Sequence, residues 1–81
     1  MTNSEPSSAK LLEAKQRELL NELVMVRLKS EVRQDVLAQR METSQANVAR
    51  LEKIDASNPR LDTLMAWADA LDLELTLTPR I

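Results

Sequence analysis

Residues 34–53, QDVLAQRMETSQANVARLEK, constrain the fold more than any other part of this 81-residue chain. Apolar residues recur there at helical spacing on both sides of a polar break: Leu37 and Met41, then Val48 and Leu51. Because Glu42 and Thr43 interrupt the pattern and Ser44 is a good N-cap, a second helix is expected to start at Gln45. The segment therefore predicts two short helices joined by a tight turn.

These two helices are expected to cross closely, because Ala38 is the smallest side chain of the first one. The second helix then exposes a polar face: Gln45, Asn47, Arg50 and Lys53. Amide and guanidinium groups hydrogen-bond base edges, and cationic groups bind phosphates. The arrangement is a helix-turn-helix, and it predicts DNA binding, with an ordinary solvated helix face as the alternative interpretation.

The composition restricts the chain to one small domain with few kinds of chemistry. A chain of this length buries only about 60–65 % of its unfolded surface, so dimerisation is a reasonable expectation. Cysteine and histidine are absent, which excludes disulfides, thiolate catalysis and most zinc sites. No nucleophile–base pair, metal cluster or phosphate-binding loop can be assembled, so neither enzymatic activity nor a cofactor is expected.

The charge and hydropathy patterns bear on partners and location. The net charge is −2, yet residues 27–60 carry seven Lys and Arg against five acids. The small positive excess therefore coincides with the predicted helix-turn-helix, and affinity for DNA is expected to need a dimer that presents two such surfaces. The N-terminus lacks the apolar segment of a signal peptide, and no apolar run approaches membrane-spanning length, which predicts a cytoplasmic protein with no membrane contact.

The chain before the helix-turn-helix predicts one long helix. Residues 1–6 are expected to form a disordered tail, followed by a single domain over residues 7–81. Ser7 or Ser8 can cap a helix that runs to about Ser30. Its apolar stripe comprises Leu11, Leu12, Leu19, Leu20, Leu23, Val24 and Leu28.

After the helix-turn-helix, a loop over residues 54–59 leads to a fourth helix over about 61–71. One face of this helix is expected to be apolar: Leu61, Leu64, Met65, Ala68 and Leu71. Trp67, the only aromatic residue, is expected to anchor the core, with a place in an interface as the alternative. The fold class is therefore mainly α.

The C-terminal residues 73–78, LELTLT, alternate strictly and predict a β-strand that ends at Pro79. The chain offers no second strand, so the unpaired backbone groups are expected to pair across a dimer. That pairing would bury Leu73, Leu75 and Leu77. Strand addition by a different protein and a frayed tail are the alternatives.

The run RQDVLAQRMETSQANVARLEK, followed by NPRLDTLMAWADALDLELTLTPR, resembles the Cro/C1-type (XRE) helix-turn-helix family. More narrowly, it resembles the HigA-type antitoxins of bacterial toxin–antitoxin operons. The resemblance covers residues 24–79. It implies a bundle of about four helices that binds DNA as a homodimer.

The resemblance also implies roles for individual residues. The base-facing positions are Gln45, Ala46, Asn47 and Arg50. The phosphate-facing positions are Gln34, Ser44 and Lys53, to which the charge pattern adds Arg60. Gln34 is also implied to brace the recognition helix, and Arg27 to form a structural ion pair with Glu52. Arg40 is expected to be a solvated charge.

The chain departs from the family pattern at the turns, because it contains no glycine. Glu31, Glu42 and Ile54 stand where the family usually has glycine, and Arg33 stands in place of a capping Thr. A residue other than glycine held at positive φ costs on the order of 1 kcal/mol. The local turn geometry is therefore the part of the fold that the resemblance predicts least well.

Three functions remain open at this point. The first is an antitoxin that represses its own operon at a palindromic site and neutralises a RelE/HigB-like RNase toxin, for which residues 9–22 offer a surface. The second is a stand-alone phage or restriction-control repressor. The third is a helical adaptor that binds protein without binding DNA.

Overall fold

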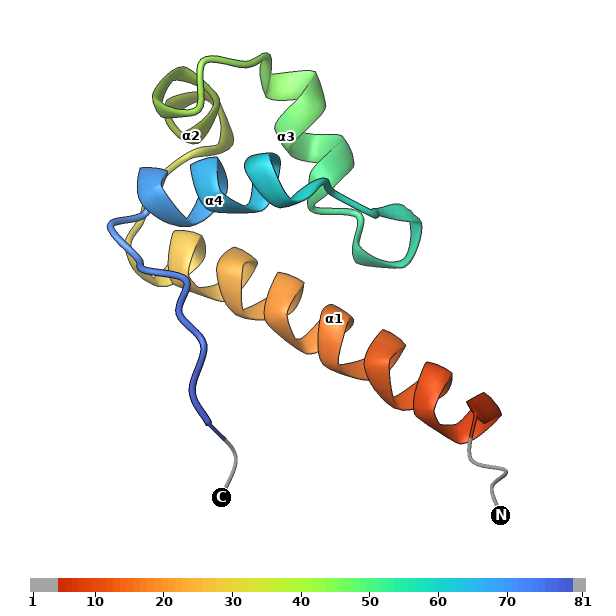
Figure 1. The fold of residues 1–81 in the computed structure, drawn as a ribbon. Coiled ribbons are helices and arrows are strands. Elements are labelled where there is room, and N and C mark those ends of the chain that lie inside the picture. The colour runs from red at the N-terminus through yellow and green to blue at the C-terminus, as the bar shows by residue number, and fades with distance from the viewer. Residues whose placement is uncertain (1–4, 80–81) are drawn as a thin grey trace.

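A computed structural model describes residues 5–79 and contains four α-helices and one short 3-10 helix (Figure 1). The elements are α1 (Glu5–Lys29), α2 (Gln34–Arg40), α3 (Gln45–Leu51), η1 (Ile54–Ala56) and α4 (Leu61–Ala70). The prediction of a mainly α fold with four helices is confirmed. α2, α3 and α4 gather against the C-terminal half of α1, whose N-terminal half extends away from them (Figure 1).

The long first helix begins earlier than predicted. α1 starts at Glu5, so the last two residues of the predicted tail are helical, and residues 1–4 lie outside the described part of the chain. Pro6 is compatible with this start, because the first turn of a helix has no internal acceptor for its N–H groups. Of the predicted apolar stripe, Leu20 and Leu23 are buried, whereas Leu11 and Leu12 are exposed.

The core forms where the last turns of α1 meet the other three helices. Trp67, Leu37 and Val48 have no exposed surface, and Ala38 is only 3 % exposed. The remaining buried hydrophobic residues are Leu20, Leu23, Leu51, Ala68, Ala70 and Leu71. The predictions that the apolar residues of both helix-turn-helix segments face the core and that Trp67 anchors it are therefore confirmed.

α4 buries only part of the face that was predicted. Ala68 and Leu71 are buried and Leu64 is partly buried, as expected. Leu61 and Met65 are 69 % and 56 % exposed, whereas Trp67 is buried. The helix is rotated so that its largest apolar side chain, Trp67, faces the core, because that burial removes the most apolar surface from water. This rotation leaves Leu61 and Met65 at the surface.

Three turns hold acidic residues in the left-handed region that glycine usually occupies. Glu31, Glu42 and Asp72 have φ of 58°, 57° and 60° and follow α1, α2 and α4. Each turn makes the two backbone hydrogen bonds of a Schellman motif. After α1, Glu31 N–H donates to Leu28 O and Val32 N–H donates to Arg27 O. The corresponding bonds are Glu42 N to Gln39 O and Thr43 N to Ala38 O after α2, and Asp72 N to Asp69 O and Leu73 N to Ala68 O after α4. These bonds satisfy the last carbonyls of each helix, so the turns form despite the unfavourable side chains.

Of the three positions where the family usually has glycine, two behave as expected and one does not. Glu31 and Glu42 occupy left-handed turns as the family pattern implied, but Ile54 begins η1 and has no positive φ. Asp72 was not foreseen, because the sequence marks the end of α4 only weakly.

The predicted C-terminal strand is not formed within the described part of this chain. Residues 73–79 have neither helix nor strand structure, and the last backbone bond recorded for them is Leu73 N to Ala68 O, 2.8 Å. A strand requires ladder bonds to a second strand, and among residues 5–79 no other extended segment lies beside this one (Figure 1). Leu73 and Leu75 are each 38 % exposed and Leu77 is fully exposed.

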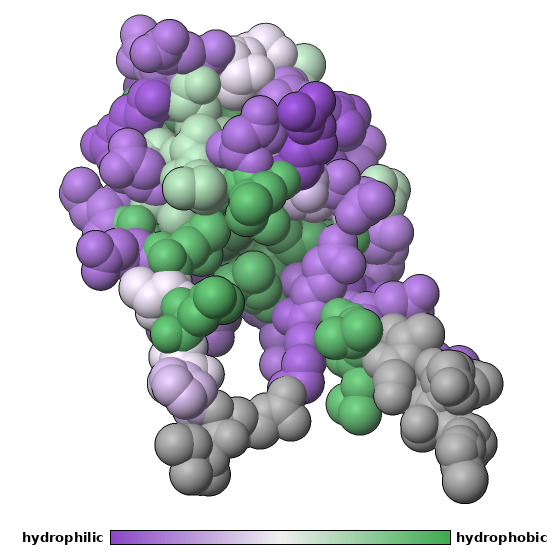
Figure 2. All heavy atoms as spheres, in the orientation of Figure 1, coloured by the Kyte–Doolittle hydropathy of each residue, from purple (hydrophilic) through white to green (hydrophobic). Residues whose placement is uncertain are grey.

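Apolar side chains gather on the face of the molecule that carries α4 and the C-terminal segment (Figure 2). The exposed large hydrophobic residues of α4, the end of α1 and this segment are Met25, Leu28, Leu61, Met65, Leu73, Leu75 and Leu77. A small surface hollow is lined there by Met65, Ala68, Leu73 and Leu75, among others.

Candidate nucleic-acid interface

α3 begins at a well-formed cap. Ser44 has an extended backbone, with φ −91° and ψ 154°, and its Oγ accepts a hydrogen bond of 3.1 Å from the Asn47 backbone N–H. This bond satisfies one of the N–H groups that have no partner within the helix. Because Val48 and Leu51 are buried, the opposite side of α3 is directed to solvent.

That solvent side carries the residues predicted to contact DNA. We call it the polar face of α3. It comprises four residues of the helix, Gln45, Ala46, Asn47 and Arg50, together with Lys53, which follows the helix by two residues. All of them are exposed except Asn47, which is partly buried. The structure therefore places the predicted base-facing residues on one short helix, with Ser44 at its start.

Asn47 is held in place by contacts on both sides of its amide. Its Nδ2 donates to Thr43 Oγ1 at 3.0 Å, and its Oδ1 accepts a hydrogen bond from Arg50 Nη2. The three side chains therefore form a continuous chain of hydrogen bonds from the turn between α2 and α3 to the polar face of α3. The sequence pattern alone did not predict this chain.

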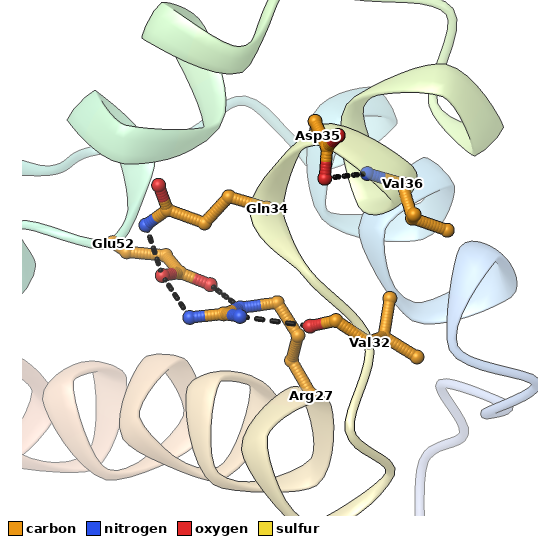
Figure 3. Close-up of polar contacts among 6 residues, drawn as sticks. All are labelled: Arg27, Val32, Gln34, Asp35, Val36 and Glu52. Atoms are coloured by element: carbon orange, nitrogen blue, oxygen red, sulfur yellow. Dashed lines mark hydrogen bonds and ion pairs between the residues drawn. The ribbon is translucent and has the colours of Figure 1, made fainter.

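The C-terminal end of α3 is fixed by a buried ion pair (Figure 3). Arg27 Nε and Nη2 lie 2.5 Å and 2.9 Å from the two carboxylate oxygens of Glu52, and the side chains are only 10 % and 8 % exposed. Arg27 Nη1 also donates to the Val32 carbonyl at 2.8 Å, and Gln34 Nε2 donates to Glu52 Oε1 at 2.8 Å. Three hydrogen bonds thus tie α1 and α2 to the residue that follows α3, and a fourth ties Arg27 to the α1–α2 connection.

Glu52 needs this arrangement, because it is the C-cap of α3 and a negative charge at a helix C-terminus is unfavourable. A bidentate contact with a guanidinium offsets both that effect and the loss of hydration. Gln34 uses one amide hydrogen in the network, which leaves its second amide hydrogen available for a phosphate and its carbonyl oxygen available for water.

The remaining phosphate candidates lie at the surface around α3. Lys53 and Arg60 are exposed, and Arg60 lines a surface hollow together with Asn47 and Arg50. Its ion pair with Asp62, at 3.4 Å, joins side chains that are 85 % and 72 % exposed. Exposed ion pairs contribute little to the free energy of unfolding, so Arg60 can exchange Asp62 for a phosphate at little cost.

Arg40 has a different role from the solvated charge that was expected. Its Nη1 donates to the Ala70 carbonyl at 3.1 Å, at the last turn of α4. A cation at a helix C-terminus is stabilising, so Arg40 joins α2 to α4. No local pattern predicts this contact, because the two residues are 30 positions apart.

A comparison with protein-family models shows that residues 22–76 match the Cro/C1-type HTH DNA-binding domain. The chain belongs to this family. No curated protein and no solved structure was found to match it significantly. The match covers the end of α1 and all of α2, α3 and α4, so the family assignment rests on the part of the chain that forms the core.

The matched region contains the polar face of α3 and both residues of the ion pair, Arg27 and Glu52. The N-terminal half of α1 precedes the matched region.

Over residues 5–79, no group of three or more His, Cys, Asp or Glu side chains is arranged to hold a metal ion. None of the helices within that range is both long and apolar enough to cross a membrane.

Proposed function

We propose that this protein is a sequence-specific transcriptional repressor that inserts α3 into the major groove of DNA. The observation that carries the proposal is the polar face of α3, capped by Ser44 at one end and braced by Arg27 and Glu52 at the other. A recognition helix needs this rigidity, because base contacts require side chains in defined positions. Residues 7–81 would act as one domain.

The proposed contacts divide into two kinds. Gln45, Ala46, Asn47 and Arg50 lie on the side of α3 that would enter the groove, where side chains can read base edges or position those that do. Gln34, Ser44, Lys53 and Arg60 would bind phosphates, which position the protein without specifying sequence. Arg50 is the strongest candidate for direct base recognition, since its guanidinium can bind guanine O6 and N7 together.

Replacement of Arg50 by alanine tests the DNA-binding proposal. The probe is the duplex that the wild-type protein selects from a random library, compared with random duplex DNA. We expect R50A to weaken binding to the selected duplex by roughly 5- to 150-fold, equivalent to about 1–3 kcal/mol, with a much smaller loss on random DNA. Fluorescence anisotropy at constant salt measures both affinities.

The matched control is R17A, which removes the same charge from the exposed surface of α1. It should lower both affinities slightly and equally. Equal losses on both duplexes for R50A would make Arg50 a phosphate contact. A wild-type protein that selects no sequence would instead support a helical adaptor without DNA binding.

We further propose that the protein is a homodimer in which two C-terminal segments pair as antiparallel strands. The alternation of Leu73, Leu75 and Leu77 and their exposure support this arrangement. A pairing centred on Leu75 places each Leu73 opposite Leu77 of the second copy. The neighbouring registers would place Glu74 opposite itself, or Leu73 opposite Pro79, which has no N–H to donate.

The absence of cysteine allows a direct test of this register. In a pairing centred on Leu75, two copies of L75C have Cα atoms about 4.5–5.5 Å apart, which suits a disulfide. We expect L75C to form a covalent dimer under mild oxidation, as seen by non-reducing electrophoresis. T76C is the control, because its two copies would be about 8 Å apart, beyond disulfide reach. Equal crosslinking of both variants would contradict the register.

A role as the antitoxin of a HigA-like operon is the more specific form of the proposal. It is supported by the resemblance over residues 24–79 and by the N-terminal half of α1, which precedes the family match. That half exposes Leu11 and Leu12, at 58 % and 67 %, where a RelE/HigB-like toxin would bind.

Co-expression with the product of the adjacent gene tests the antitoxin role. We expect the two proteins to co-elute in size-exclusion chromatography, and the double variant L11E/L12E to lose the partner while keeping its affinity for DNA. K15E is the matched control, because it changes charge on the same exposed turn without altering apolar surface. A neighbouring product that the wild-type protein never retains would favour a stand-alone repressor.

A further inference from the structure

We infer that Asn47 acts as a positioning residue, which orients the Arg50 guanidinium for base recognition instead of reading a base itself. The inference rests on the proposed DNA-binding function and assigns a specific role within it. It is carried by the side-chain contacts of Thr43, Asn47 and Arg50 in the DNA-free protein.

The start of this hydrogen-bond chain is fixed by the backbone. The Thr43 N–H donates to the Ala38 carbonyl at 2.9 Å as part of the Schellman motif that ends α2. Thr43 is partly buried, and its Oγ1 accepts from Asn47 Nδ2 at 3.0 Å. The Asn47 backbone N–H is bound by the Ser44 cap. Both the main chain and the amide of Asn47 are therefore held before any DNA is bound.

The far side of the amide then holds Arg50. Asn47 Oδ1 accepts from Arg50 Nη2, although Arg50 itself is exposed. A guanidinium carries five N–H groups, so this contact leaves one two-pronged edge free for guanine O6 and N7. An amide that read adenine would instead have to direct both its oxygen and its nitrogen toward the base. The observed contacts direct the two groups to Arg50 and Thr43.

This arrangement reduces the entropy that Arg50 loses on binding. Immobilising a long side chain at an interface weakens binding by about 2- to 10-fold for each such side chain. A guanidinium already held by Asn47 avoids part of that loss. Arg50 also keeps one orientation, which favours one base position over its neighbours.

The first experiment uses the protein without DNA. The ¹⁵N order parameter of the Arg50 Nε–H group is measured by NMR in the wild-type protein, N47A and N47D. We expect a clear decrease in N47A and retention of most of the order in N47D, because aspartate still accepts from the guanidinium. Aspartate is also well tolerated in the first turn of a helix. Unchanged order in N47A would overturn the inference, whether or not the protein binds DNA.

The second experiment is a double-mutant cycle on the duplex selected by the wild-type protein. We expect N47A to weaken binding by roughly 2- to 10-fold and to have no further effect in the presence of R50A. Q45A is the matched control on the same face, and its effect should add to that of R50A. Additive losses for N47A and R50A would identify Asn47 as an independent base contact and overturn the inference.

The N47D variant provides the decisive comparison on DNA. Its preference for guanine is the ratio of its affinities for duplexes with guanine and with another base at the position that Arg50 contacts. This ratio should stay within about twofold of the wild-type value, because the added charge weakens binding to both duplexes alike. A loss of that preference as large as in N47A would contradict the positioning role. A wild-type protein that selects no sequence would remove the proposed function, while the NMR result would still decide whether Asn47 orders Arg50.

Discussion

Replacing Arg27 with methionine is expected to lower the free energy of unfolding by about 3–5 kcal/mol, because it leaves the Glu52 carboxylate buried without its partner. Both side chains are about nine-tenths buried, so water cannot replace the lost hydrogen bonds. A domain of this size has a total stability of about 4–12 kcal/mol, so R27M should lose a large fraction of it. Urea unfolding followed by the fluorescence of Trp67, the only tryptophan, measures the change.

Two variants separate the loss of the buried pair from a general effect of removing a charge. R33M breaks the exposed pair with Asp35, whose side chains are 77 % and 52 % exposed, and should cost less than about 1 kcal/mol. The double variant R27M/E52L removes both charges and should recover part of the stability lost by R27M alone. A loss in R27M no greater than that in R33M would show that the pair contributes little.

Replacing Glu31, Glu42 and Asp72 together with glycine is expected to stabilise the protein by about 2 kcal/mol. Each residue has a positive φ near 60°, which costs a side chain with a Cβ about 1 kcal/mol or more. The greater freedom of glycine in the unfolded chain offsets part of this gain at each site. Removal of an acidic side chain from a helix C-terminus adds a smaller benefit.

Thermal unfolding followed by circular dichroism measures this effect, and an increase in Tm of roughly 8–16 °C is expected. The triple alanine variant removes the charges but keeps the Cβ atoms, so it should give little of the gain. E22G, in the regular helix of α1, should instead lose about 1 kcal/mol. A triple glycine variant no more stable than the alanine variant would show that the turns are not strained.

The helix-turn-helix was predictable because its signals are local. The period of Leu37 and Val48, the cap at Ser44 and the polar break before it all act within one or two helical turns. The structure confirms the burial of both apolar residues and the Ser44 cap. The two acidic turns at Glu31 and Glu42 followed from the resemblance, because glycine usually stands at those positions.

The errors concern contacts between elements that are distant in the sequence. Leu61 and Met65 fit an amphipathic pattern, yet the rotation of α4 depends on how Trp67 fits among three other helices. Arg40 reaches the end of α4 only because the two helices pack together. The strand at residues 73–78 needs a second strand, so alternation alone could not establish it.

The sequence by itself therefore determined the positions of the four helices, the cap of α3 and the set of polar residues on its exposed face. Short-range periodicity and capping decide these features. Only the tertiary structure decided which face of α4 is buried, which residues hold Arg40 and Glu52, and how Thr43 and Asn47 orient Arg50. Those features depend on distances and angles between packed helices, which a linear pattern does not contain.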